Sequence, residues 1–231
     1  MPLKGIIDTA RSLAYWERLQ EVTSNNVANA NTDAFKADRL AAHILPGGEH
    51  PVPVQSTDLS GGSLRDTGRP LDLALEGDGY FVVRTARGER LLRGGSLRLD
   101  AQGVLTDMNA NPVLGTQGPM VLSGANIEVH GDGTVVVDGS VAGRLRIESP
   151  NAPDRMLKEG QGRFIPGGPT HEVDEGGTQV RQGAVEEANM DPLLSMIDLV
   201  TIQRAYATNI EALHAMDSVL GTITTEVGRV P

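Results

Sequence analysis

The segment "MDPLLSMIDLVTIQRAYATNIEALHAMDSVLGTITTEVG", residues 190–228, contains a helical repeat that decides the fold. Asp191 is placed to cap the start of the helix, and Pro192 fills the first helical position, where its missing N–H costs nothing. Apolar side chains then recur three or four residues apart, with a mean step of 3.5. They are Leu199, Ile202, Tyr206, Ile210, Leu213, Met216, Leu220, Ile223 and Val227. This spacing is typical of a coiled-coil seam and favours a partner helix, while packing on the chain's own domain is the alternative.

A second helix is predicted at the other end of the chain. Apolar residues recur at helical spacing from about residue 3 to residue 30, and neither Gly nor Pro interrupts 6–30. They include Ile6, Ala10, Leu13, Leu19, Val22, Val27 and Ala30. The pattern predicts one helix roughly 40 Å long at 1.5 Å per residue.

The centre of the chain, residues 71–187, is punctuated by glycine and predicts β-hairpins. "LDLALEGDGYFVVRT" (71–85) and "IEVHGDGTVVVDG" (127–139) each place a Gly-Asp-Gly turn between apolar runs. Short β-type runs joined by such turns are typical of antiparallel strands. Four parts are therefore expected: an N-terminal helix with an Asn-rich end (1–36), an extended connector (37–70), a β-rich domain (71–187) and a C-terminal helix (188–231).

The composition excludes several classes of protein. The net charge of −10 and the lack of a basic run argue against nucleic-acid binding. The chain has no cysteine, which removes thiol catalysis, cysteine zinc sites and disulfides. It has no apolar run long enough to span a membrane, and its N-terminus lacks the apolar core of a cleaved secretory leader.

Residue patterns for catalysis and for cofactor binding are also missing. The histidines His43, His50, His130, His171 and His214 do not share ligand spacing on one helix. Gly77-Asp78-Gly79 and Gly131-Asp132-Gly133 lack the run of oxygen ligands that calcium loops need, so we interpret both as tight turns. We therefore expect no enzyme, no metal and no cofactor. Two other hypotheses are a β-rich binding module and a structural subunit, and only the second accounts for both helices.

Three motifs resemble the flagellar rod, hook and hook-associated protein family. "SNNVANANTDAFK" (24–36) is similar to the family pattern A-N-N-L-A-N-x-x-T-x-G-F-K. "RPLDLALEGDGYFVV" (69–83) is similar to P-L-D-V-A-I-x-G-D-G-F-F, and residues 180–220 are similar to Q-G-x-L-E-x-S-N-V-N … M-I-x-x-Q-R-A-Y-E. The motifs lie at the start, middle and end, so the resemblance covers the whole chain.

The resemblance implies a mainly β central domain whose long N- and C-terminal helices pair as a coiled coil, α+β overall. It implies a structural subunit of the bacterial flagellar basal-body rod, which self-assembles with other axial proteins and transmits motor torque to the hook. Members are exported by the flagellar type III machinery without a cleaved signal, into the periplasm-spanning rod, and take no cofactor, nucleic acid or small-molecule substrate. Within the family a proximal-rod protein fits best. The alternatives are a distal-rod or hook-type axial protein, or an extracellular β-rich binding module.

The residues expected to form the assembly interface come from the signature and from the C-terminal helix. They are Asn25, Asn26, Ala28, Asn29, Asn31, Thr32, Phe35, Lys36, Leu199, Ile202, Gln203, Arg204, Tyr206, Ile210, Leu213, Met216, Leu220 and Ile223. Asparagine amides both donate and accept, so they can satisfy the open carbonyl groups of a helix end and bond a neighbouring chain. The family has Gly before the signature Phe, whereas this chain has Ala34, which predicts a turn with negative φ there.

Overall fold

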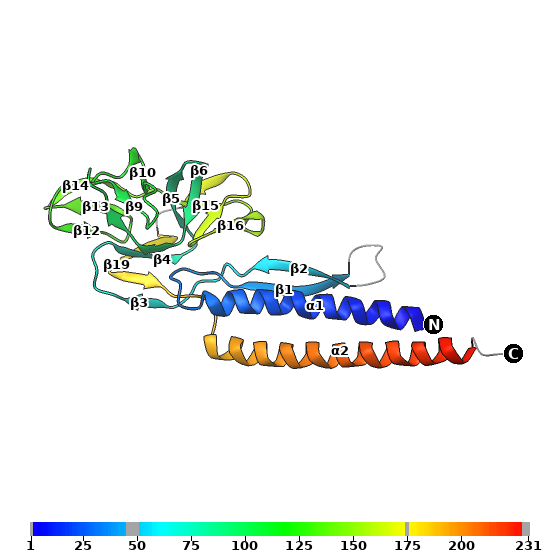
Figure 1. Ribbon diagram of the computed structural model, residues 1–231. Helices are drawn as coiled ribbons and strands as arrows, with labels where there is room; N and C mark the ends of the chain where they lie inside the picture. Colours follow the sequence, from blue (N-terminus) through cyan, green and yellow to red (C-terminus); the bar gives the residue numbers. More distant parts are fainter. Residues whose placement is uncertain (1, 45–50, 174–175, 228–231) are drawn as a thin grey trace. The chain divides into compact units, whose positions relative to one another are not determined.

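The computed structural model describes residues 2–44, 51–173 and 176–227 (Figure 1). By packing, the chain forms two compact units. The helical unit comprises residues 1–28, 38–56 and 191–231, and the β unit comprises residues 29–37 and 57–190. The predicted α+β class, with a mainly β centre between N- and C-terminal helices, is confirmed.

Two long helices, α1 (Pro2–Ala28) and α2 (Pro192–Val227), pack side by side in the helical unit. They run antiparallel, so that the start of α1 lies beside the end of α2 (Figure 1). The carboxylate of Asp191 accepts hydrogen bonds from the backbone N–H groups of Leu193 (2.8 Å) and Leu194 (3.2 Å), which confirms the predicted cap. None of the described helices is long and apolar enough to cross a membrane.

The helical unit also contains a two-stranded ribbon, β1 (Asp38–Ile44) and β2 (Pro51–Thr57), and α1 contacts β1. The ribbon lies in the segment that was predicted as an extended connector, 37–70, and so does β3 (Leu64–Asp66). Pro and Gly content alone indicated the connector. β3 pairs with β20, and β1 packs against α1. Both of these partners lie outside residues 37–70, so the local composition does not indicate them.

The β unit is built around a six-stranded sheet with the order β16-β17-β6-β5-β15-β18. Each strand of this sheet runs antiparallel to its neighbours. In that order the strands are β16 (Leu157–Gly160), β17 (Arg163–Ile165), β6 (Gly88–Leu92), β5 (Tyr80–Thr85), β15 (Ile147–Pro150) and β18 (Thr170–Glu172). A short 3-10 helix, η1 (Pro153–Arg155), precedes β16.

Two three-stranded sheets accompany it. One has the order β19-β4-β7, with β19 (Thr178–Gln182), β4 (Asp72–Gly77) and β7 (Gly94–Ser96). The other is β12 (Ile127–Val129), β13 (Thr134–Val137) and β14 (Ser140–Arg144). The smaller pairs are β3 with β20 (Ala184–Glu186), β8 (Arg98–Leu99) with β9 (Leu105–Thr106), and β10 (Leu114–Gly115) with β11 (Gly118–Pro119).

The β unit contains two apolar core clusters, one large and one small. The most deeply buried members of the large cluster include Leu73, Phe81 and Val135 from the two predicted β segments, and also Val113 and Leu145. Gly131-Asp132-Gly133 forms a turn between the paired strands β12 and β13, as predicted, with Gly133 at φ +85°. Gly77 also has a positive φ, +108°, but β4 and β5 on either side of Gly77-Asp78-Gly79 lie in different sheets, so the hairpin predicted for 71–85 does not form. Strands also form between residues 149 and 173, where β17 and β18 pair with β6 and β15.

Candidate assembly surface

One face of α2, which we call the inner face, packs against α1. Asn209 accepts a hydrogen bond from the hydroxyl of Ser12 (3.3 Å), and Met216 lies within 3.8 Å of the hydroxyl of Thr9. Other residues along the same face are mostly shielded: Ile202 is 5% exposed, and Leu199, Tyr206, Ile210, Leu213 and Leu220 are half-buried. The predicted seam residues therefore lie on this face, except that Met216 is 39% exposed. The side chain of Ile223 lies outside the described residues.

Asn209 occupies a seam position that the sequence analysis assigned to Ile210. Counted from Ser195, positions 199, 202, 206, 209, 213, 216 and 220 follow one another in alternating steps of four and three residues. The list of apolar residues alone breaks this alternation, because it contains two successive steps of four, from 202 to 206 and from 206 to 210. The amide of Asn209 also donates to the carbonyl of Ala205 at 2.8 Å. A search restricted to apolar residues misses such a position, and the regularity of the repeat is the signal that finds it.

The opposite face of α2 is apolar at its start. Five exposed side chains fall within residues 193–200: Leu193 (72% exposed), Leu194 (60%), Met196 (49%), Ile197 (62%) and Val200 (47%). We call these five residues the outer row. Positions 193, 197 and 200 are spaced i, i+4, i+7 and share one side of the helix. The predicted interface residues Gln203 and Arg204 follow this row and are also exposed.

Within the helical unit, the signature contributes Asn25 and Asn26 at the end of α1. Asn26 is buried, and its amide donates to the carbonyl of Asp38 (2.8 Å) while its oxygen accepts from the N–H of Asp38 (3.0 Å). Asn26 thus bonds the start of β1 as a neighbouring strand would. Asn25 and Ala28 are exposed.

The rest of the signature belongs to the β unit. The N–H of Thr32 donates to the carbonyl of Asn29 (2.9 Å) and so closes a turn after the helix, while Asn31 is exposed. Phe35 is half-buried, and the ammonium of Lys158 lies 4.4 Å from its ring centroid.

Ala34 corrects the predicted backbone geometry. Its φ is +55°, not negative, and its side chain is fully buried. Its N–H donates to the carbonyl of Glu186 at 2.6 Å, and this bond from the far end of the chain holds Ala34 in the left-handed region. Ala34 thus adopts the left-handed geometry that a Gly would permit freely, at a cost in strain of about 1 kcal/mol.

Lys36 ends the signature inside a buried charge network that sequence reasoning missed. Its ammonium lies 2.5 Å from one carboxylate oxygen of Glu186, and Nε of Arg93 lies 2.7 Å from the other. The exposed fractions of the three side chains are 0%, 1% and 7% for Lys36, Glu186 and Arg93. Burial lowers the pKa of Lys36, and the hydrogen bond and charge of Glu186 partly oppose that effect.

Backbone groups complete the network. Lys36 donates to the carbonyl of Ser60 (2.6 Å), Arg93 donates to the carbonyl of Gly79 (2.7 Å), and the N–H of Gly62 donates to Glu186 (2.8 Å). Asn189 lies close by in sequence, accepts from the N–H of Ala37 (2.7 Å) and donates to the carbonyl of Asp58 (2.8 Å). These bonds tie the signature to the segment just before α2.

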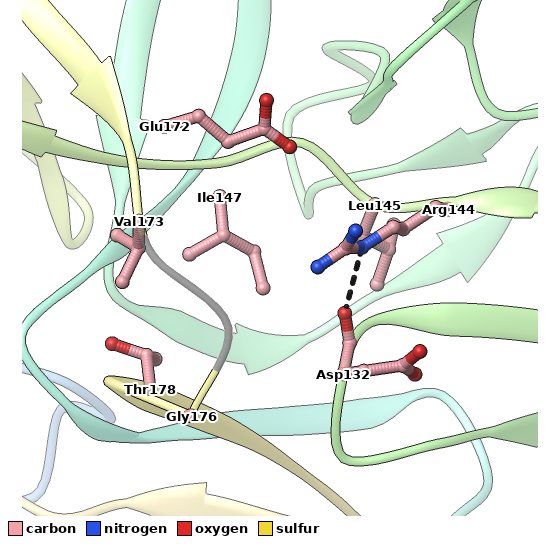
Figure 2. Close-up of a pocket in the computed structure, with 8 residues that line it drawn as sticks. All are labelled: Asp132, Arg144, Leu145, Ile147, Glu172, Val173, Gly176 and Thr178. Carbon is pink, nitrogen blue, oxygen red and sulfur yellow. Dashed lines mark hydrogen bonds between the residues drawn. The ribbon is translucent and has the colours of Figure 1, made fainter.

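The β unit contains a cavity of about 140 Å³ (Figure 2). Its lining residues are Asp132, Arg144, Leu145, Ile147, Glu172, Val173, Gly176 and Thr178. Two of the polar side chains that line it bond to nearby backbone carbonyl groups. Arg144 donates to the carbonyl of Asp132 (3.0 Å), and Thr178 donates to the carbonyl of Asp78 (2.7 Å). Hydrogen bonds from the backbone and hydroxyl of Thr134 hold the pKa of Asp132 below its usual range, so this carboxylate is a poor proton donor at neutral pH.

No group of three His, Asp or Glu side chains is arranged for a metal ion within 2–44, 51–173 and 176–227. The arrangement that these residues do form is structural. A helix pair presents an exposed apolar row, and a β unit is fastened to the sequence signature by buried polar contacts. This arrangement defines a structural protein of the helix–β–helix class.

Comparison with known proteins identifies the family. The model for the C-terminal part of flagellar basal body rod FlgEFG proteins matches residues 181–226, and the flagella basal body rod protein model matches residues 17–36. Flagellar basal-body rod protein FlgF of Mesorhizobium japonicum is 30% identical over 201 residues, which cover 82% of this chain and 83% of the relative. FlgF of Escherichia coli K12 is 29% identical over 226 residues (87% and 89%). FlgG of Bacillus subtilis 168 is 25% identical over 255 residues (94% and 97%).

The chain therefore belongs to the flagellar basal-body rod protein family, as the three motifs predicted.

Proposed function

We propose that this chain is a structural subunit of the bacterial flagellar basal-body rod, which assembles with other axial proteins and carries motor torque to the hook. The observation that carries the proposal is the outer row of α2. A solvated helix face is polar, whereas five exposed apolar side chains in eight positions form a surface that gains free energy when covered. At about 25 cal/mol per Å² of apolar area, covering such a row favours association with another helix.

In this proposal the two faces of α2 make different contacts. The inner face, with Ile202 at its centre, pairs with α1 as a coiled coil within one subunit. The outer row, together with Gln203 and Arg204, meets the neighbouring subunit. The exposed signature residues Asn25, Ala28 and Asn31 extend that contact surface, whereas Asn26 and Lys36 are buried and hold the fold.

Family resemblance supplies the finer proposals. FlgF relatives support a proximal-rod position, with a distal-rod position as the alternative because FlgG also matches. The proposed location is the periplasm-spanning rod, reached through the flagellar type III export machinery without a cleaved signal. The proposed role involves no catalysis, cofactor, nucleic acid or small-molecule substrate.

The test is a charge placed in the outer row. Leu193→Asp with Ile197→Asp, expressed in a flagellated host that lacks its own copy, should abolish incorporation into isolated basal bodies and stop motility. The purified variant should melt at the wild-type temperature, because both side chains are already exposed.

A matched control lies in the β unit. Val141 has the same 72% exposure as Leu193, and Val141→Asp should leave incorporation and motility intact. Normal rods from the double variant, or equal defects in both proteins, would refute the outer row as the assembly contact.

A further inference from the structure

The ribbon β1–β2 has two long edges, and an exposed strand edge is a template for pairing with another chain. Apart from Thr57, every residue of β2 is exposed. Two of them, Pro51 and Pro53, lie at alternate positions in the sequence "PVPVQST" (51–57). The side of the strand on which their nitrogen atoms lie decides what this edge can bind, because proline has no N–H to donate.

The hydrogen bond that continues the ribbon fixes that side. The N–H of Asp58, the residue directly after β2, donates to the carbonyl of Ala37, the residue directly before β1, at 2.8 Å. In a strand, the N–H groups of alternate residues point to the same side. The N–H groups of Val52 and Val54 therefore point toward β1, like that of Asp58, and the nitrogen atoms of Pro51 and Pro53 lie on the outer edge.

The other edge is protected by a different device. The carbonyl of Ala37 points toward the β2 side, where it accepts from Asp58, so the N–H and carbonyl of the next residue, Asp38, point away from β2. Asn26 of α1 bonds both groups of Asp38. The contact of α1 with β1 continues this cover (Figure 1). The amide of Asn26 thus occupies the backbone N–H and carbonyl of Asp38, to which an incoming strand would otherwise bond.

We infer that Pro51 and Pro53 prevent another strand from pairing with the outer edge of β2. An added strand would find no donor at two alternate positions of the outer edge, and each missing bond leaves an acceptor of the incoming strand unpaired. Copies of this chain consequently do not pair edge to edge through β2, and a partner meets the ribbon through its faces. The inference does not depend on the proposed rod function.

The experiment restores the two donors. Pro51→Thr with Pro53→Thr places β-forming residues with free N–H groups on the outer edge. Sedimentation equilibrium and thioflavin T fluorescence should show self-association strengthened about tenfold or more relative to wild type, since a few added hydrogen bonds of ordinary net worth give that factor. Val52→Thr with Val54→Thr is the matched control, because it adds the same side chains to the same strand without changing the outer edge. Association through α2 would be equal in all three proteins.

Amide hydrogen exchange tests the strand phase directly. In the dilute monomer of the double proline variant, the two new amides should exchange at rates within about tenfold of an unprotected amide, and they should slow by a hundredfold or more when the protein associates. Protection already present in the monomer would place these N–H groups on the β1 side and overturn the inference. Unchanged self-association of a folded variant, with the new amides unprotected at every concentration, would overturn it as well.

Discussion

Replacing Glu186 by Gln removes the one anion of a buried network that holds two cations. In the variant Lys36 and Arg93 stay buried and lose their carboxylate partner. Lys36 keeps the carbonyl of Ser60, and Arg93 keeps the carbonyls of Gly79 and Leu75 and the ring of Tyr80. Breaking a buried ion pair by removing one partner costs about 3–5 kcal/mol, because the remaining charge is left uncompensated. In a domain the size of the β unit, that cost corresponds to a fall in melting temperature of roughly 10 °C or more.

The neighbouring residue provides the control. Glu187 pairs with Arg65, and their side chains are 44% and 53% exposed. Glu187→Gln should cost about 0–1 kcal/mol, as exposed ion pairs do. Differential scanning calorimetry and guanidinium unfolding followed by circular dichroism would compare the two variants with wild type.

A pH series strengthens the test. Burial lowers the pKa of Lys36, so the folded state binds fewer protons than the unfolded state between that pKa and about 10.4, and stability rises with pH across this window. Glu186→Gln removes the hydrogen bond and the charge of Glu186, which raise the Lys36 pKa, so that pKa falls further and the window in which stability rises with pH widens. Adding Lys36→Met should abolish the rise and recover part of the lost stability. Equal stability of the Glu186→Gln and Glu187→Gln proteins, within 1 kcal/mol, would refute the network as a stabilising element of the β unit.

Three further outcomes are expected. Asn209→Leu should raise the melting temperature of the helix pair but loosen its alignment, detected as extra disulfide cross-links between cysteines placed one turn out of register along α1 and α2; a single cross-linked pair, as in wild type, would contradict a registering role. Asp72→Asn should flatten the acid limb of stability. Burial raises the pKa of Asp72, but hydrogen bonds from Thr67 and Arg69, with Ser96 assisting, outweigh it and hold the pKa below its usual range, so stability present above about pH 4 is lost as the pH falls through the folded value; an unchanged acid limb in urea titrations would count against this carboxylate. Ala34→Val should destabilise the β unit by about 2–4 kcal/mol in denaturant titrations, because a β-branched residue is strained at φ +55° and the site is fully buried; a loss below 1 kcal/mol would show that the backbone relaxes there.

Local signals predicted the helices and the class of fold well. Asp191 and Pro192 mark the start of α2 through chemistry that acts within one turn, and the apolar repeat identifies its inner face. The same repeat, counted over apolar residues only, passed over Asn209, whose place in the seam is evident from spacing and not from polarity.

Contacts between distant segments were the part that sequence could not supply. Lys36 and Glu186 are 150 residues apart, and neither position carries a local mark of burial; an isolated charged residue is ordinarily exposed. The left-handed turn at Ala34 has the same origin, since the carbonyl of Glu186 holds it there. The motif resemblance identified these residues as a set but gave no reason for the lysine, which the buried network now supplies.

The late strands β19 and β20 also set the order in which the β unit can form. β4 pairs with β19, and β3 pairs with β20. β20 also contains Glu186, whose carboxylate binds Lys36, 150 residues earlier in the chain. Contacts of such long sequence separation must close large loops before they repay the entropy, and domains dominated by them fold in milliseconds to seconds rather than microseconds. At a synthesis rate of about 5–20 residues per second, β3 and β4 leave the ribosome several seconds before β20 and β19 exist. The β unit is thus a body that matures only after nearly the whole chain is present, and its first strands spend that interval with an open edge.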